Sequence, residues 1–274
     1  MIDNLTLAKK AALAAGEVIL SYYTKESAQL CIDQKSEDVR DKVTAADFAA
    51  NERIVRMLYK EGSEAGILTE EKLETDDIEL RKRMDNPFSY RRFWCIDPID
   101  GTLHFINKTD DFGVHIALIQ ENAVVLGVSY LPAHGIMYWS DGKYSYRDAV
   151  KIHCSEVAEF AGARFLESTH YPEPTTPLFV QEGVVLSTPG CIGNKAGLIA
   201  EGKNDAFVKT QFGLNLWDVA SSIPVITCAG GKVTDRDGKS LNLREAKLAN
   251  GFVMANAALH EKIIEILEKN KKNV

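Results

Sequence analysis

Two aspartates three residues apart, Asp97 and Asp100, follow directly on an apolar segment and could bind a metal ion together. Residues 94–102 read WCIDPIDGT. The proline stiffens the backbone, and the glycine lets the backbone approach a ligand closely. Thr102 is expected to begin a short helix, whose free N–H groups favour an anion. The pattern predicts carboxylate metal ligands beside a phosphate-binding turn, although an exposed Asp-Gly turn would give the same letters.

Three further acids stand where carboxylates could join such a site. Asp47 follows Thr44 by three residues and Asp218 follows Asn215 by three, so each fits a helix-capping pattern. Glu70 ends a short apolar segment. Taken singly, a cap acid would more often stabilise its own helix, by ~0.3–1 kcal/mol, and Glu70 would be a solvated strand end.

Other reactive residue types give no comparable pattern. The five cysteines are scattered and never form a C-x-x-C pair, which argues against a disulfide framework and a cysteine zinc site. Lys195, taken alone, is expected on the surface. The six histidines show no metal-ligand or triad spacing, and we assign them no role. They are His104, His115, His134, His153, His170 and His260.

Composition limits the classes of partner. The 274 residues carry a formal net charge of −7, which disfavours a nucleic-acid polymer because no basic patch of convincing length offsets it. No run approaches the ~18 uncharged apolar residues of a membrane span, and the first residues do not resemble a signal peptide. We therefore expect a cytoplasmic enzyme, with peripheral association at the inner membrane face left open.

The elements that must position the acids follow from apolar spacing. Steps of three or four residues predict helices at 5–23, 44–61 and 258–269. Apolar and β-branched runs predict strands at 66–68 and 93–96 and a meander over 112–146. Helix-like and strand-like segments alternate after a boundary near 147–155. We expect a layered α+β protein in two halves, 1–150 with most of the metal-binding motifs and 151–274 completing the active site.

A highly charged segment, residues 71–92, interrupts the first half. We expect a solvated, partly helical insertion that is the most mobile internal segment. Because it joins Glu70 to Asp97, we also expect it to lie beside the cleft.

Together, in order, the acidic motifs resemble those of the inositol monophosphatase superfamily of metal-dependent phosphatases. The motifs are VTAAD at 43–47, LTEE at 68–71, DPIDGT at 97–102, and WDVA at 217–220 with AGG at 229–231. The resemblance extends from about residue 5 to residue 256. It implies the layered αβαβα sandwich of inositol monophosphatases and fructose-1,6-bisphosphatases, and Mg²⁺ as the cofactor, as two or three ions.

The resemblance also implies roles for individual residues. The implied Mg²⁺ ligands are Glu70, Asp97, the backbone carbonyl of Ile99, Asp100 and Asp218, with Asp97 bridging two ions. The implied catalytic residues, which orient and activate the attacking water, are Asp47, Thr102 and Glu70. The implied substrate-binding residues are Gly101, Thr102, Lys195 and Asp218, with Lys195 near the nucleotide.

Within the superfamily, the chain resembles the CysQ-type branch of 3'(2'),5'-bisphosphate nucleotidases. Residues 112–119 read FGVHIALI where that branch has FTVNIALI, and segments 101–106, 130–138 and 198–202 are also similar. The chain departs from the branch at Leu103, His104, Gly113 and residues 191–194. The resemblance implies Mg²⁺-dependent, lithium-sensitive removal of the 3'-phosphate of adenosine 3',5'-bisphosphate, a step linked to sulfate assimilation.

Two other readings stay open. An inositol or sugar phosphatase of the same superfamily would have the same acids, and a non-catalytic phosphate-binding protein could retain the fold. The intact acids, Asp47, Glu70, Asp97, Asp100 and Asp218, speak against the second of these. In each reading the partner is a small-molecule phosphate, and the sequence leaves a homodimer open.

Overall fold

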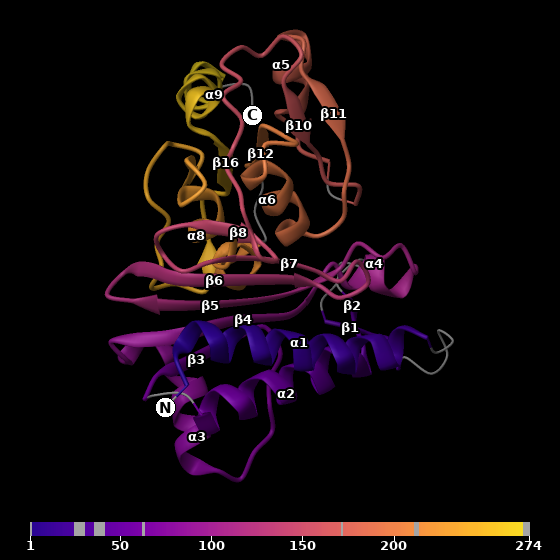
Figure 1. Ribbon diagram of the computed structural model, residues 1–274, viewed down its shortest axis with the longest axis vertical. Helices are drawn as coiled ribbons and strands as arrows, with labels where there is room; N and C mark the ends of the chain where they lie inside the picture. Colours follow the sequence, from indigo (N-terminus) through magenta and orange to yellow (C-terminus); the bar gives the residue numbers. More distant parts are fainter. Residues whose placement is uncertain are drawn as a thin grey trace.

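A seven-stranded sheet lies across the middle of the molecule in the computed structural model, which describes residues 2–24, 31–35, 42–61, 64–170, 172–210 and 214–270 (Figure 1). In spatial order its strands are β3 (Gly66–Thr69), β4 (Arg92–Asp100), β5 (Gly113–Gln120), β6 (Ala123–Leu131), β7 (Ile136–Ser140), β8 (Ser145–Arg147) and β9 (Val150–Lys151). β3 pairs with β4 in parallel, and all later pairs are antiparallel. The predicted meander is therefore present.

Two long helices cover one face of this sheet, α1 (Asn4–Tyr23) and α2 (Ala45–Glu61) (Figure 1). Asp3 caps α1 by accepting a hydrogen bond from the Thr6 amide. The inner stripe of α1 is mostly alanine, which lets the helix lie close to the sheet and to α2. At Gly16 an added Cβ would lie 2.4 Å from Cε1 of Tyr130, so this contact with β6 requires glycine.

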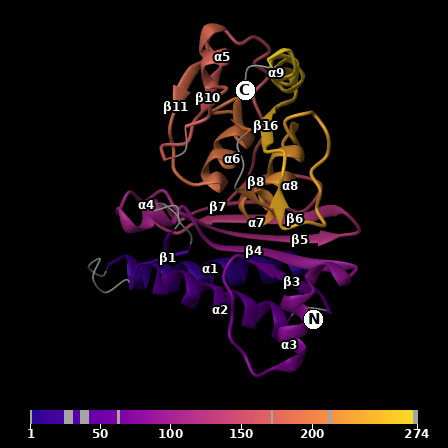
Figure 2. The same ribbon diagram turned by 180° about the vertical axis from the view of Figure 1, so that it is seen from behind.

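Short helices separate the first sheet from a second one (Figure 2). They are α6 (Ile192–Ala200), α7 (Leu216–Val219) and α8 (Ser222–Thr227). The second sheet has the order β11 (Val185–Ser187), β10 (Arg164–Leu166), β12 (Ala206–Lys209), β16 (Phe252–Asn256) and β14 (Gly231–Thr234). α5 (Thr176–Gln181) and α9 (Ala257–Lys269) pack on its outer face through a separate apolar cluster. The layers are αβαβα, as the resemblance implies.

The two sheets come from successive parts of the chain, 66–151 and 164–256. The middle helices contact both, because α6 packs against β5 and β6 on one side and against β12 and β16 on the other. The predicted division into two halves near residue 150 stays a prediction. The two sheets pack against the same middle helices, so the structure does not separate them into two units. None of the described helices is long and apolar enough to cross a membrane.

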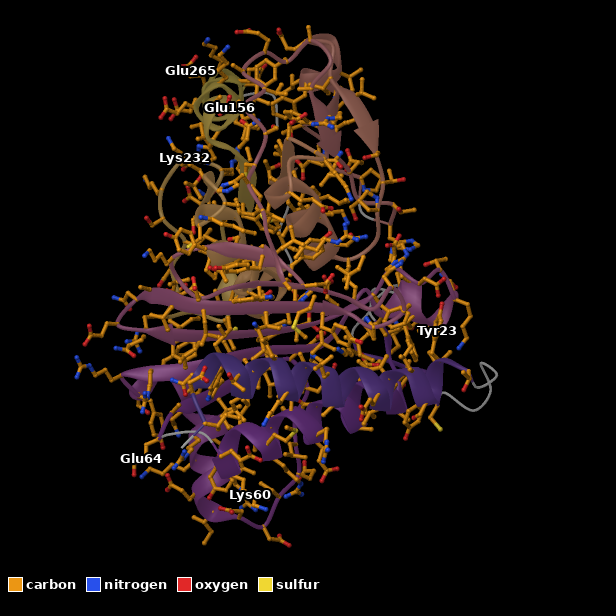
Figure 3. All side chains as sticks on the ribbon, in the orientation of Figure 1. Tyr23, Lys60, Glu64, Glu156, Lys232 and Glu265 are labelled. Carbon is orange, nitrogen blue, oxygen red and sulfur yellow. The ribbon has the colours of Figure 1, made fainter. Side chains whose placement is uncertain are left out.

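The charged insertion follows a path that differs from the expectation. It contains α3 (Ile78–Asp85) and the 3-10 helix η2 (Pro87–Ser89), which confirms its partly helical character. Pro87 packs against Gly66 at the start of β3, whereas Glu70 follows the end of that strand. In Figure 3, Lys60 and Glu64 mark the end of the molecule where Pro87 packs against Gly66. Tyr23 lies near α4 (Thr102–Ile106) at the opposite end. Most of the insertion therefore lies away from the acids, and its mobility stays a prediction.

Two pairs of very short strands complete the described elements. β1 (Asp33–Gln34) pairs with β2 (Lys42–Val43) just before α2, and β13 (Leu214–Asn215) pairs with β15 (Lys247–Leu248) just before α7. β2 and β13 each lead into a helix whose third residue is a candidate site acid, Asp47 in α2 and Asp218 in α7.

Candidate active site

Asp47 and Thr102 meet across the gap between α2 and α4. The backbone N–H and the hydroxyl of Thr44 both donate to Oδ2 of Asp47, at 2.8 and 2.6 Å, so the predicted capping pattern is present. The other oxygen, Oδ1, lies 3.3 Å from the Thr102 hydroxyl. That hydroxyl is also 3.2 Å from the carbonyl oxygen of Ile99. Asp47 is fully buried, and burial raises its pKa to about 7, with Glu70 and Glu71 adding to the shift against the Thr44 hydrogen bonds.

The DPIDGT run ends β4 with an irregularity that turns its acids toward one another. Asp97 lies opposite His115 of β5 and Asp100 opposite Gly113, so one extra residue is accommodated in β4. Pro98 suits this position because it has no N–H to contribute to the ladder. Gly101 follows with φ 87°, a left-handed conformation that favours glycine, and Phe105 donates its N–H to the Gly101 carbonyl to begin α4.

Asp97 is buried as well, and within the described chain one of its oxygens lacks a partner. It is 2% exposed, and among the described residues its Oδ1 atom has no hydrogen-bond partner. Burial, followed by the nearby carboxylates of Glu70, Asp100 and Asp218, raises the pKa of Asp97 well above its ordinary value. A buried carboxylate with an unpartnered oxygen and three acidic neighbours is poorly stabilised unless a cation or a proton joins it.

Glu70 and Asp218 reach the same place from neighbouring elements. The Glu70 amide bonds to the carbonyl of Ile96, which places Glu70 beside the end of β4. Asp218 lies in α7 and forms a complete capping box with Asn215, whose amide donates to it at 2.7 Å. Burial and the charge of Glu70 raise the pKa of Asp218. Lys35, which the sequence did not single out, places Nζ 2.7 Å from Oε1 of Glu70 and contacts Glu71 as well.

Asp100 has a different environment, because it is surrounded by hydrogen-bond donors. Nε2 of His115 lies 2.8 Å from its Oδ2 atom. The amides of Ile192 and Gly193, at the start of α6, donate to the same oxygen. Burial alone would raise the pKa of Asp100, but His115 and the charge of Lys195 outweigh burial and lower it. The pKa shift of Asp100 is therefore opposite in direction to those of Asp47, Asp97 and Asp218.

The chemistry of these donors fits Mg²⁺. Carboxylate and carbonyl oxygens are the hard ligands that Mg²⁺ prefers. Within the described residues, Oδ1 of Asp97 has no partner, and the charges of three more acids act on this carboxylate. The residues that would hold the ions are Glu70, Asp97, Ile99 through its carbonyl, Asp100 and Asp218.

A second group of metal-ligand types adjoins this one. Potential ligand atoms of Asp100, His115 and Cys191 lie within 4.8 Å of one another. A metal-bound histidine normally donates its other ring N–H to an acceptor. Within the described part of the chain, Nδ1 of His115 is buried and has no partner. Burial also raises the pKa of the Cys191 thiol well above its ordinary value, which disfavours the thiolate. We therefore do not assign a transition metal to this trio.

Comparison with known proteins decides the family. A model of the inositol monophosphatase family matches residues 2–272. The protein belongs to the inositol monophosphatase family. Two curated relatives are equally similar in identity. A histidinol-phosphatase from Chlorobaculum parvum is 29% identical over 281 residues and spans 100% of both chains. A 3'(2'),5'-bisphosphate nucleotidase CysQ from Salmonella typhimurium is 29% identical over 245 residues, 87% of this chain and 94% of its own.

A solved structure supports the fold of this inositol monophosphatase family member. The extragenic suppressor protein suhB from Bartonella henselae matches it with a TM-score of 0.81 at 24% identity, over 96% of this chain and 98% of that chain. The family membership confirms the superfamily resemblance and the phosphatase class. The two curated relatives differ in the substrates that their names give, so the substrate is a separate question.

In this family member, the position of Lys195 in the fold differs from the surface position expected from its sequence context alone. Lys195 is 2% exposed, which contradicts the expectation of a surface lysine. Its Nζ contacts the carbonyl of Gly190, and burial lowers its pKa against the opposing charges of Asp100 and other groups. In this position its charge acts on Asp100. A contact with a nucleotide substrate is not shown and stays a prediction.

His115 is the main correction to the sequence analysis. It was assigned no role, yet it donates to a candidate metal ligand. A signal did exist, because an antiparallel pair of β4 and β5 places His115 opposite Asp97. Lys35 had no such signal, since it lies in a short segment without periodicity.

Proposed function

We propose that this protein is an Mg²⁺-dependent phosphatase that hydrolyses small phosphate monoesters with water as the nucleophile. The observation that carries the proposal is the position of Asp97, whose buried Oδ1 atom lacks a partner among the described residues while Glu70, Asp100 and Asp218 act on it. Such an arrangement is costly for stability alone. It is suited to holding divalent cations next to a phosphate group.

Asp47 and Thr102 are the candidates for handling the water. The Thr102 hydroxyl has one proton and two acceptors in reach, Oδ1 of Asp47 and the Ile99 carbonyl. A water near Thr102 would be oriented by this pair. With a pKa raised to about 7, Asp47 can accept a proton from that water near neutral pH. Bound Mg²⁺ would supply positive charge that favours ionisation of the water and neutralises the leaving oxygen.

The phosphate would lie against the turn at Gly101. The left-handed conformation of Gly101 and the start of α4 leave backbone N–H groups free to donate to an anion. A side chain at this position would be strained, because a Cβ would lie 2.9 Å from the Asp111 carbonyl oxygen. Gly101 and Thr102 are thus the proposed phosphate-binding residues.

The substrate that we propose first is adenosine 3',5'-bisphosphate. Support comes from the CysQ-like segments of the sequence and from the 29% identity to the CysQ of Salmonella typhimurium. The buried position of Lys195 weakens its proposed contact with the second phosphate, so another cation would have to bind that group.

A second candidate, histidinol phosphate, is favoured by the side chain of Asp111. This carboxylate is 27% exposed next to the phosphate turn and accepts a hydrogen bond from Asn194 at 2.9 Å. It would attract the ammonium group of an amino alcohol phosphate and repel a second phosphate. The histidinol-phosphatase of Chlorobaculum parvum, which matches over the full length of both chains, points the same way.

A phosphate-release assay with four substrates tests the proposal. They are adenosine 3',5'-bisphosphate, histidinol phosphate, inositol 1-phosphate and fructose 1,6-bisphosphate. We expect the first to give the highest kcat/KM, and a higher value for any other would refute the nucleotidase assignment. Asp47→Asn serves as the control that the release comes from this site. Asp111→Asn should lower kcat/KM for histidinol phosphate and not for the bisphosphate.

A further inference from the structure

His115 adjoins two glycines that leave room for its ring. At Gly193 an added Cβ would lie 2.1 Å from Cε1 of His115, and at Gly113 it would lie 3.2 Å away. Gly193 is at the start of α6 and Gly113 begins β5, so residues far apart in sequence are small where the imidazole lies. Positions 113, 115 and 193 all fall in segments where the chain departs from the CysQ-type pattern.

The hydrogen bonds of the ring define its role as a donor. His115 is 1% exposed, and Nε2 lies 2.8 Å from Oδ2 of Asp100. Its Nδ1 atom is buried with no partner among the residues described. A proton on Nδ1 would be buried without an acceptor, which is unfavourable. Of the two neutral tautomers, the one with its proton on Nε2 is therefore favoured, and that proton points to Asp100.

Three donors consequently converge on one oxygen of Asp100. Besides His115, the amides of Ile192 and Gly193 donate to Oδ2. Cys191, the cap residue of α6, makes no side-chain cap, so Asp100 performs that function from β4. With Oδ2 occupied in this way, the carboxylate cannot rotate freely, and Oδ1 is the oxygen left for a cation.

We propose that His115 is a positioning residue that orients Asp100 toward Mg²⁺ and restricts it to one coordinating oxygen. The proposal rests on the metal-ligand role proposed above for Asp100. Hydrogen-bond partners of metal ligands typically contribute 10–100-fold to metal affinity. The donor at position 115 should therefore set how tightly the ions bind, and Gly193 should be needed only to admit the ring.

The test measures metal binding without substrate, using Mn²⁺ as the probe because it prefers the same oxygen ligands as Mg²⁺. Free Mn²⁺ is followed by electron paramagnetic resonance during titration of each purified variant. His115→Met removes the donor at similar volume and should raise the Kd by about 10-fold or more. His115→Gln keeps an amide N–H at similar reach and should stay within about threefold of the wild type.

Equal losses in the two His115 variants would overturn the proposal, because packing and not donation would then be the cause. A wild-type Kd in His115→Met would also overturn it. Asp100→Asn separates this outcome from failure of the proposed function. If Asp100→Asn binds Mn²⁺ normally, the ligand assignment itself is wrong; if only His115→Met binds normally, the positioning role alone is wrong.

A second pair of variants covers the case in which His115→Met does not fold. Gly193→Ala should displace the ring and raise the Kd, because its Cβ would overlap the ring carbon. Adding His115→Gln to Gly193→Ala should restore binding, since the flexible amide can avoid the new methyl group. Unchanged binding in Gly193→Ala, or no recovery in the double variant, would contradict the proposal.

Discussion

Replacing Asp97 by asparagine should separate metal binding from folding. Asp97 is 2% exposed and its pKa is raised well above the ordinary value by burial and by its acidic neighbours, which favours the protonated form when no metal is bound. Asparagine has nearly the same shape as protonated aspartic acid and cannot ionise. The metal-free variant should therefore unfold at close to the wild-type temperature.

The response to Mg²⁺ should differ strongly between the two proteins. At about 100 times its Kd, a ligand that binds only the native state stabilises it by about 2.7 kcal/mol. For a chain of this size, ~2–4 °C of Tm per kcal/mol gives a wild-type increase of roughly 5–10 °C. Asp97→Asn lacks the proposed bridging carboxylate, and its Tm should change by less than about 2 °C.

Thermal unfolding in EDTA and across an MgCl₂ titration measures both quantities. Asp85→Asn, an exposed acid at the end of α3 and on the far side of the molecule, is the matched control and should show the full Mg²⁺ response. A wild-type response in Asp97→Asn would refute the ligand assignment. A large loss of Tm in the metal-free variant would show that Asp97 is ionised and partnered in the native state, against the reasoning above.

Three further outcomes follow from the same site. Asp47→Asn should lower kcat by about 10²–10⁴-fold while keeping the Mg²⁺-induced increase in Tm, and an unchanged kcat would remove Asp47 from the mechanism. Asp47 alone should remove roughly 2–3 kcal/mol of unfolding free energy from the metal-free protein between pH 5 and 7.5, and the raised pKa values of Asp97 and Asp218 act in the same direction. The folded-state pKa of Asp47, about 7 against an ordinary 3.8, means that the native state holds the extra proton across this window. Urea unfolding in EDTA at the two pH values measures this loss, and a rise in stability would contradict it. Phosphate release should stop in excess chelator and return with Mg²⁺, whereas turnover that persists in chelator would exclude a metal-dependent reaction.

The local structure around Asp47, Asp218 and the DPIDGT run could be predicted from sequence because each follows a local pattern, whereas only the family resemblance implied a common site. Asp47 and Asp218 lie three residues after Thr44 and Asn215, and both capping interactions are present. Such caps depend only on the nearest turn of chain. Strand β4 ends in the DPIDGT run because an apolar segment stops there, which is also local information.

The missed features depend on contacts between distant segments. The role of His115 can be recognised only when β5 is paired with β4 and α6 brings Gly193 to the ring. No residue spacing in the sequence predicts these two contacts. Lys195 did carry a local signal, because Ile199, four residues later on α6, is buried on the same helical face. The path of the insertion could not be derived from its charges, since it is set by Leu80 and Pro87, two apolar residues that are buried away from the acids.

The shared middle layer has a consequence for how the chain is synthesised. By the end of β9 the first sheet is made, but the face that carries Phe93 and Ile119 is buried by apolar residues of α6 and α7. At about 5–20 residues per second on the ribosome, α6 follows roughly 2–8 s later. During that interval the nascent sheet exposes an apolar surface that the finished protein hides. A chain interrupted near this point would be a substrate for chaperones and proteases, and it would lack Asp218, the acid that α7 contributes to the proposed metal site.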